Sequence, residues 1–202
     1  MEDKLFEKYV LNNKVEVPNR LAVAPLTLFS SNEDGSINDE EREYLKMRGT
    51  GIGLYILGAT VVSQEGITGH NQPRSLSEKD LPSLEERAKI IKSQGALAIN
   101  QIHHGGALAI KDFTGVDPVA PSADIANESL KERKLFHSPV RELTDSEIKK
   151  IIQDFAYSCE LSIKSGYDGI EIHGANNYLI QQFFLHIQTD VLMNGVVLLK
   201  IV

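Results

Sequence analysis

The chain has 202 residues, of which 42% are hydrophobic and 24% charged, a balance typical of a globular protein with one domain or two small ones. Acidic residues outnumber basic ones by 28 to 21 and the pI is about 5.4, so nucleic acid and anionic membrane surfaces are not expected as partners. A single cysteine, an N-terminus without a leader-like pattern and no apolar run of about 20 residues predict a cytoplasmic protein without a membrane helix.

Strand-like and helix-like segments alternate from the first strand onward. Residues 21–26 (LAVAPL) are a short apolar run ended by Pro25, which predicts a buried strand. A helix is expected over residues 37–49, with Asn38 as the N-cap and acidic residues in the first turn. Residues 53–63 are apolar on both faces, as expected of a strand that is covered on both sides.

The same alternation continues to the middle of the chain. Ser83 and Glu86 have the spacing of a capping box and predict a helix over residues 83–95. Residues 96–104 (ALAINQIHH) predict the third strand. Residues 105–141 contain three prolines and are too long for a bare connection, so this segment is expected to be functional or to carry a hairpin.

A long helix and a fourth strand complete the pattern. Thr144 and Glu147 repeat the capping-box spacing and predict a helix over residues 145–166, followed by a strand over 169–172 (GIEI). Cys159 lies on the apolar stripe of this helix, and no basic group accompanies it, so it is interpreted as a core residue rather than a nucleophile. The repeated order of strand and helix predicts a parallel sheet, either open and doubly wound or part of a (β/α) barrel.

Polar and small side chains gather where the four predicted strands end, and in both architectures these ends meet at one rim. The residues are Ala24, Pro25, Leu26 and Thr27 after the first strand, Gly58 and Ala59 at the second, Gln101, His103 and His104 at the third, and His173, Asn176 and Tyr178 after the fourth. Such a set suits a planar cofactor with heteroatoms along its edge. No GxGxxG or GxxxxGK[ST] motif follows any strand, which argues against a classical dinucleotide or P-loop site.

Each of these residues also has a purely structural interpretation. His103 and His104 are two hydrogen-bonded histidines or a metal pair, but adjacent strand residues point to opposite faces, which is poor geometry for chelation. Gln101 is equally well a hydrogen-bonded core amide. The spacing of His173, Asn176 and Tyr178 is more informative, because two neutral donors can stabilise a developing oxyanion and a tyrosine hydroxyl can deliver a proton, provided that all three face the same space.

Six segments extend this interpretation to a family. They are NRLAVAPLT, YILGATVVS, LAINQIHHGG, VAPSA, RELTDSEI and GYDGIEIHGANNYLIQQFF, and together they cover the chain nearly continuously from Phe6 to Phe184. The chain resembles the old yellow enzyme family of FMN-dependent ene reductases, whose fold is a (β/α)8 TIM barrel. The resemblance implies that NADH or NADPH reduces FMN, and that hydride then passes from flavin N5 to an activated alkene of the enone or nitroalkene class.

The same resemblance implies roles for individual residues. Thr27 would hydrogen-bond near the flavin C4 carbonyl, and Ala59 and Gln101 would contact the pyrimidine edge. His173 and Asn176 would bind the substrate oxygen, and Tyr178 would protonate the α-carbon. The implied cofactor-binding residues are Ala24, Pro25, Leu26, Thr27, Ala59, Gln101 and His173; the implied catalytic residues are His173, Asn176 and Tyr178; no metal is implied.

Family members are much longer than this chain, and their second half supplies an arginine near the flavin N1 edge and the FMN phosphate site. Residues 1–184 are therefore expected to be the N-terminal half of a TIM barrel, truncated after about four βα units. We expect this chain to hold FMN weakly or not at all and to be inactive alone. Its open sheet edges would permit aggregation, a homo-oligomer, or a noncatalytic role in association with another chain.

Residues 185–202 lack the family's character, which at this point usually resembles SPHTNRRTDEWGGSFENR. Codons can be chosen for this tail so that regrouping them by one nucleotide encodes that string. We therefore hypothesise that loss of one T in the codons for Phe183 and Phe184 shifted the reading frame. The alternative is a natural short isoform with a new terminal helix.

Overall fold

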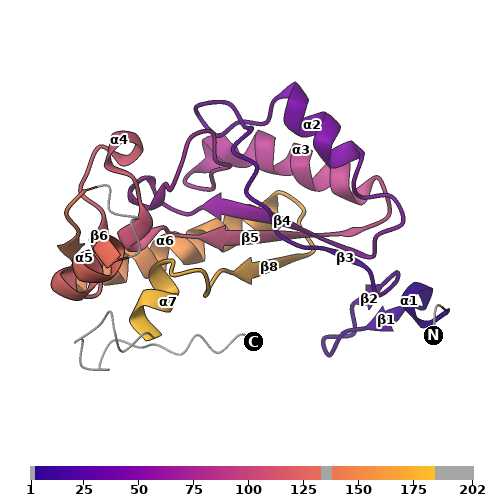
Figure 1. Cartoon of the computed structure of the whole chain (residues 1–202). Coiled ribbons are helices and arrows are strands. Elements are labelled where there is room, and N and C mark those ends of the chain that lie inside the picture. The colour runs from indigo at the N-terminus through magenta and orange to yellow at the C-terminus, as the bar shows by residue number, and fades with distance from the viewer. Residues whose placement is uncertain (1–2, 133–137, 185–202) are drawn as a thin grey trace.

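The computed structural model describes residues 3–132 and 138–184. At its centre is a four-stranded parallel sheet, in which neighbouring strands follow the order of the chain. The strands are β3 (Ala22–Val23), β4 (Leu54–Val61), β5 (Leu97–His103) and β8 (Gly169–Ile172). Figure 1 shows helices α2 and α3 together on one side of these strands. This arrangement confirms the predicted parallel α/β sheet.

Three helices pack against the sheet, and the other elements surround them. The three are α2 (Asp39–Lys46), α3 (Leu81–Lys92) and α6 (Asp145–Lys164). The other elements are α1 (Asp3–Phe6), β1 (Tyr9–Val10), β2 (Glu16–Val17), η1 (Gln64–Gly66), η2 (Glu78–Asp80), η3 (Gly106–Leu108), α4 (Lys111–Thr114), β6 (Val119–Ala120), α5 (Ala123–Glu132), β7 (Arg141–Glu142) and α7 (Leu179–Phe184). No helix within the described residues has the length and apolarity needed to cross a membrane.

The largest apolar cluster lies between the sheet and these helices. It combines side chains of α2, α3 and α6 with those of β4 and β5, among them Leu45, Tyr55, Leu57, Leu84, Ile91 and Leu161. Full burial of a leucine or isoleucine contributes about 1.5–3 kcal/mol. This layer therefore fixes the sheet and, with it, the positions of the strand ends.

Two of the three predicted helix starts are confirmed. The Asn38 side chain accepts the Glu41 backbone N–H at 3.0 Å, and Thr144 forms the predicted capping box with Glu147. The prediction for α3 is wrong, because this helix begins at Leu81, after a capping box that joins Ser77 to Asp80. Ser83 lies inside the helix instead, where its hydroxyl accepts the backbone N–H of Ile37 at 3.2 Å.

The segment predicted as a loop over residues 105–141 contains regular structure. Among its described residues, β6 and β7 form a two-stranded ladder, and α5 lies between them in sequence. The two strands are parallel, so they do not form the hairpin that was one of the two alternatives expected here, since a hairpin would be antiparallel. The other alternative, a functional role of the segment, stays a prediction. Cys159 of α6 is half-buried against an apolar cluster that includes Phe155 and Ile102, in agreement with its interpretation as a core residue.

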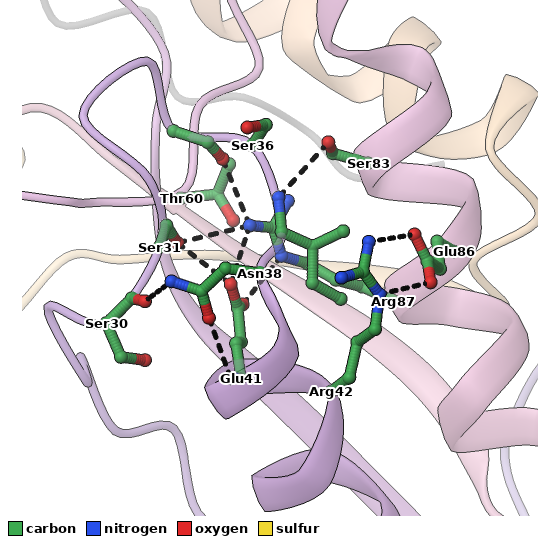
Figure 2. Close-up of polar contacts among 12 residues, drawn as sticks. Ser30, Ser31, Ser36, Asn38, Glu41, Arg42, Thr60, Ser83, Glu86 and Arg87 are labelled. Atoms are coloured by element: carbon green, nitrogen blue, oxygen red, sulfur yellow. Dashed lines mark hydrogen bonds and ion pairs between the residues drawn. The ribbon is translucent and has the colours of Figure 1, made fainter.

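A buried ion pair joins α2 to α3 (Figure 2). Arg87 is 0% exposed and Glu41 is 2% exposed. The arginine Nε and Nη2 lie 2.7 and 2.9 Å from the two carboxylate oxygens. Nη2 also donates to the Ser31 hydroxyl at 3.1 Å and to the Gly35 carbonyl at 3.0 Å. The pair therefore ties the long segment that follows β3 to both helices.

The two outer strands of the sheet each have one described neighbour. β3 pairs with β4, and β8 pairs with β5, while β1 and β2 form a separate antiparallel ladder. The predicted frameshifted tail, residues 185–202, lies outside the described residues. The assignment of residues 1–184 to one domain stays a prediction, as does the cytoplasmic location.

Candidate active site

A cavity of about 540 Å³ lies at the carboxyl ends of the strands, a volume in the range of small-molecule sites. Its wall combines the segment after β3, one residue of β5, the end of β8 and the segment after β8. The lining residues are Pro25, Leu26, Thr27, Phe29, Gln101, Glu171, Ile172, His173, Gly174, Ala175, Asn176 and Tyr178. Seven residues predicted from the sequence therefore meet in one cavity.

The register of β5 and β8 explains which side chains reach this cavity. Gln101 lies opposite Glu171, and Ile102 lies opposite Ile172. Side chains alternate along a strand, so Gln101 and Glu171 share one face of the sheet, and His173, two residues after Glu171, continues that face. Ile102 points the other way and packs against α6, as its contact with Phe155 shows. The cavity thus lies on the face of the sheet opposite α6.

The segment after β8 brings the predicted catalytic residues together. The His173 backbone N–H donates to the Ile102 carbonyl at 3.0 Å, which extends the pairing with β5. Asn176 and Asn177 then adopt φ values of 57° and 58°, a left-handed conformation that asparagine tolerates better than most residues. This turn returns Tyr178 to the imidazole of His173, and the two ring centroids are 4.9 Å apart.

His173 is set up as a neutral hydrogen-bond donor. Burial lowers the pKa of its imidazole, and the nearby Glu171 carboxylate opposes that shift only in part. Its Nδ1 accepts the Ala175 backbone N–H at 3.2 Å, so the proton of the neutral ring lies on Nε2. The Asn176 side-chain nitrogen lies 3.4 Å from Nε2. Two N–H donors therefore lie side by side at the cavity wall.

His103 packs against the rings of Tyr178 and His173 and does not line the cavity. It is 0% exposed, and its ring centroid is 4.8 Å from that of Tyr178 and 6.4 Å from that of His173. Among the described residues, neither ring nitrogen has a hydrogen-bond partner. Burial, with smaller effects of His104 and His173, lowers the pKa of His103 to about 3. It is a neutral ring that contacts the two predicted catalytic rings without lining the cavity.

His104 belongs to a different environment. Its Nδ1 accepts the Gly106 backbone N–H at 3.0 Å, and burial lowers its pKa to about 4 against the opposing effect of the Glu65 carboxylate. The two histidines thus contact different groups, as expected for adjacent strand residues. Within the described residues, no group of three or more histidine, cysteine, aspartate or glutamate side chains is arranged to hold a metal ion.

Two predicted cofactor-binding residues do not reach the cavity wall. Ala24 is exposed and does not line the cavity. Ala59 is buried, and its backbone N–H donates to the Thr27 hydroxyl oxygen at 3.1 Å. This bond uses the oxygen of Thr27 as an acceptor, so its O–H proton remains free for a ligand.

Five lining residues were not predicted from the sequence: Phe29, Glu171, Ile172, Gly174 and Ala175. Glu171 is a charged residue within the apolar strand GIEI, two residues before His173, and this alternation could have placed it on the same face. Phe29 has a φ of 53° and packs its ring against Gly69, where a side-chain Cβ would lie 2.4 Å from the ring. No sequence signal predicts that position.

The cavity fits the flat ring of a flavin. Pro25 and Leu26 supply apolar wall, while Thr27 and Gln101 supply polar atoms at its edge. Gly58 leaves room beside Gln101, because an added Cβ would lie 2.6 Å from Gln101 Oε1 and 2.7 Å from Pro25 Cβ. Among the described residues that line the cavity none is cationic, so the wall fits the ring better than it fits a phosphate.

Comparisons with known proteins identify a family whose members resemble this chain. Residues 4–190 match the family model described as the NADH:flavin oxidoreductase / NADH oxidase family. The chain is 36% identical over 180 residues to the probable NADH-dependent flavin oxidoreductase YqiG of Bacillus subtilis, covering 89% of this chain and 46% of that protein. It is 34% identical over 183 residues to the NADH:fumarate oxidoreductase of Klebsiella pneumoniae, covering 90% of this chain and 19% of that protein.

A solved structure shows the same fold. The old yellow enzyme homologue of Zymomonas mobilis superposes with a TM-score of 0.80 at 27% identity, covering 93% of this chain and 53% of that one. The chain thus spans about half the length of this structure and of YqiG. Its four-stranded parallel sheet corresponds to part of a (β/α) barrel, as predicted.

Proposed function

Because the chain belongs to the NADH:flavin oxidoreductase / NADH oxidase family, we propose that it carries the flavin-ring and substrate-binding part of an FMN-dependent oxidoreductase that reduces activated alkenes with NADH or NADPH. The observation that supports this most directly is the cavity in which His173, Asn176 and Tyr178 meet Thr27 and Gln101. Apolar wall and polar edge lie together there, as a planar ring requires.

His173 and Asn176 would bind the oxygen of the substrate. Their N–H groups lie 3.4 Å apart in nitrogen-to-nitrogen distance, close enough to donate to one oxygen held between them. Neutral donors stabilise negative charge that develops on a carbonyl or nitro oxygen as the alkene accepts hydride. His173 serves in its neutral form, since burial lowers its pKa.

Tyr178 would supply the proton. Its ring packs on His173, and it lines the same cavity as His173 and Asn176. Addition of one hydride and one proton across the double bond saturates it, and oxidation of NADH or NADPH supplies the two electrons. FMN, when bound, would supply the chemistry that transfers hydride from NADH or NADPH to the alkene. Tyr178 therefore acts as general acid toward the α-carbon.

Pro25, Leu26, Thr27 and Gln101 would hold the flavin ring. Alkenes activated by a carbonyl or nitro group form the proposed substrate class, and the name of one relative, NADH:fumarate oxidoreductase, indicates that it also reduces an activated alkene. The absence of a cation among the described lining residues leads us to expect weak binding of FMN by these 202 residues, and no turnover. A purified chain that is stoichiometrically yellow and oxidises NADPH with an enone would contradict this expectation.

A chimera tests the activity itself. Residues 4–184 would replace the matching half of YqiG, with which the chain is 36% identical. The chimera should retain FMN and reduce 2-cyclohexenone with NADH or NADPH. Tyr178→Phe should lower kcat with little change in KM, and Asn176→Leu should weaken substrate binding. A folded, FMN-containing chimera that oxidises NAD(P)H but reduces no activated alkene would exclude the proposed substrate class.

A second proposed function is noncatalytic association with another chain. The open sides of β3 and β8 in the described residues favour it, since an unpaired strand edge can accept a further strand. Native mass measurement separates the two functions. A defined oligomer that binds no flavin would favour association, and a flavin-binding monomer would argue against it.

A further inference from the structure

We propose that Glu171 is a positioning residue, which orients the Gln101 amide so that its carbonyl oxygen faces the cavity and selects ring ligands with an N–H at that edge. The inference rests on the proposed function only for the identity of the ring. It concerns two side chains that lie opposite each other on β5 and β8. Both line the cavity.

The hydrogen bond between the two side chains fixes the amide. Gln101 Nε2 lies 2.6 Å from Glu171 Oε1. The amide nitrogen donates and the glutamate oxygen accepts, so the glutamine presents its NH2 group to Glu171. The opposite orientation would place two acceptor oxygens at that short distance. The short contact with Glu171 therefore distinguishes the two ends of this amide.

The other end of the amide points away from Glu171. Gln101 Oε1 lies beside Gly58 and Pro25, because a Cβ on Gly58 would be 2.6 Å from this oxygen and 2.7 Å from the Pro25 ring. Among the described residues, no donor reaches Oε1. The oxygen is thus an acceptor with free capacity next to a residue that lines the cavity.

This orientation has a consequence for ligand choice. An acceptor at the cavity edge favours a ring that carries an N–H, and disfavours one that carries a methyl group or a lone pair there. The uracil-like edge of an isoalloxazine carries such an N–H at N3. If Glu171 were replaced by an amide, either end of Gln101 could face the cavity, and the preference would be lost.

Two flavins without phosphate provide the probes. Lumiflavin has the N3–H, and 3-methyllumiflavin has a methyl group in its place. Dissociation constants would be measured by flavin fluorescence with the purified 202-residue chain. We expect lumiflavin to bind about tenfold more tightly than 3-methyllumiflavin, the difference made by one hydrogen bond. Glu171→Gln should reduce this ratio to about threefold or less, mainly through weaker lumiflavin binding.

Controls separate orientation from folding. Gln101→Leu removes the acceptor itself and should abolish the preference in the same way. Glu78→Gln, a change at an exposed glutamate outside the cavity, should leave it intact. Circular dichroism of each variant verifies folding. In the amide region of ¹⁵N NMR spectra, the Gln101 NH2 signals should shift in Glu171→Gln, an effect that requires no ligand.

The outcomes distinguish this inference from the function on which it rests. Lumiflavin binding without a preference over the methylated flavin, or an unchanged preference in Glu171→Gln, would overturn the role of Glu171 alone. If neither flavin bound the unmodified chain, the weak flavin binding expected under the proposed function would be wrong, and the role of Glu171 would be overturned with it.

Discussion

Two polar clusters, one fully buried and one partly buried, lie on different sides of the sheet, and they differ in how they keep charge out of the protein interior. Arg87 and Glu41, between the helices, are oppositely charged and bonded to each other and to the segment after β3. His103, His173 and Tyr178, on the cavity side, are rings in mutual contact, and among the described residues His103 makes no hydrogen bond. One cluster neutralises charge by pairing, and the other avoids charge altogether.

The difference separates groups that hold the fold from groups that can act on a ligand. A buried charge without its partner costs several kcal/mol, so Arg87 and Glu41 are committed to each other (Figure 2). A neutral imidazole costs less to bury and retains donor and acceptor capacity. We therefore expect the first cluster to dominate stability and the second to dominate the response to pH.

The largest effect should follow from breaking the ion pair. Arg87→Met leaves Glu41, which is 2% exposed, without its counterion, and should lower the free energy of unfolding by about 3–5 kcal/mol. Urea unfolding followed by circular dichroism measures the change. The double variant Arg87→Met, Glu41→Gln removes both charges and should be more stable than the single variant. A single variant within about 1 kcal/mol of the unmodified chain would contradict the role assigned to the pair.

Lowering the pH should act through two buried histidines, His103 in the cavity-side cluster and its neighbour His104, which lies outside that cluster. The folded-state pKa values of His103 and His104 are lowered to about 3 and about 4, against an unfolded value near 6.5. The unfolded state therefore binds more protons between these values, and stability is full above about pH 6.5 and is lost as the pH falls. The slope should approach about 1.4 kcal/mol per pH unit for each histidine. Urea unfolding between pH 6.5 and pH 4.5 measures it, above the range in which most carboxylates titrate.

His103→Phe is the matched variant for this prediction. It keeps a flat ring of similar size but removes the titrating group. The slope of unfolding free energy against pH should therefore fall by the contribution of one histidine. Stability at pH 7 should not fall, since in the described residues neither nitrogen of His103 has a partner to lose. An unchanged slope would show that His103 is not held neutral in the folded chain.

The alternation of strands and helices could be predicted because hydrophobic period and capping residues are local signals. Asn38 and Thr144 marked their helices correctly, while Ser83 did not, because Ser77 and Asp80 supplied a competing cap a few residues earlier. The parallel ladder of β6 and β7 could not be predicted. It depends on how the segment between residues 105 and 141 folds back, and two-residue strands leave no periodicity.

The cavity could also be predicted in part, because the ends of the strands can be recognised from local sequence signals. Tyr178 and Gln101 were found because parallel strands end at one rim. The hydrogen bond of Glu171 to Gln101 depends on the register of β5 against β8, which sequence periodicity does not specify. The ion pair of Arg87 with Glu41 could not be predicted from the sequence either, because the two residues lie on different helices and only the packing of those helices buries both side chains.

The smallest effect is expected at a helix end that belongs to neither cluster. Thr144 accepts the Glu147 backbone N–H, and the Glu147 carboxylate accepts the Thr144 backbone N–H at 2.9 Å. Thr144→Ala should lower the unfolding free energy by about 1 kcal/mol, and Thr144→Ser should restore most of it. Thr144 does not line the cavity, so lumiflavin affinity should stay unchanged. If Thr144→Ala were as costly as Arg87→Met, the local cap of α6 would stabilise the fold as much as the buried ion pair, and the contrast between the two sides of the sheet would no longer hold.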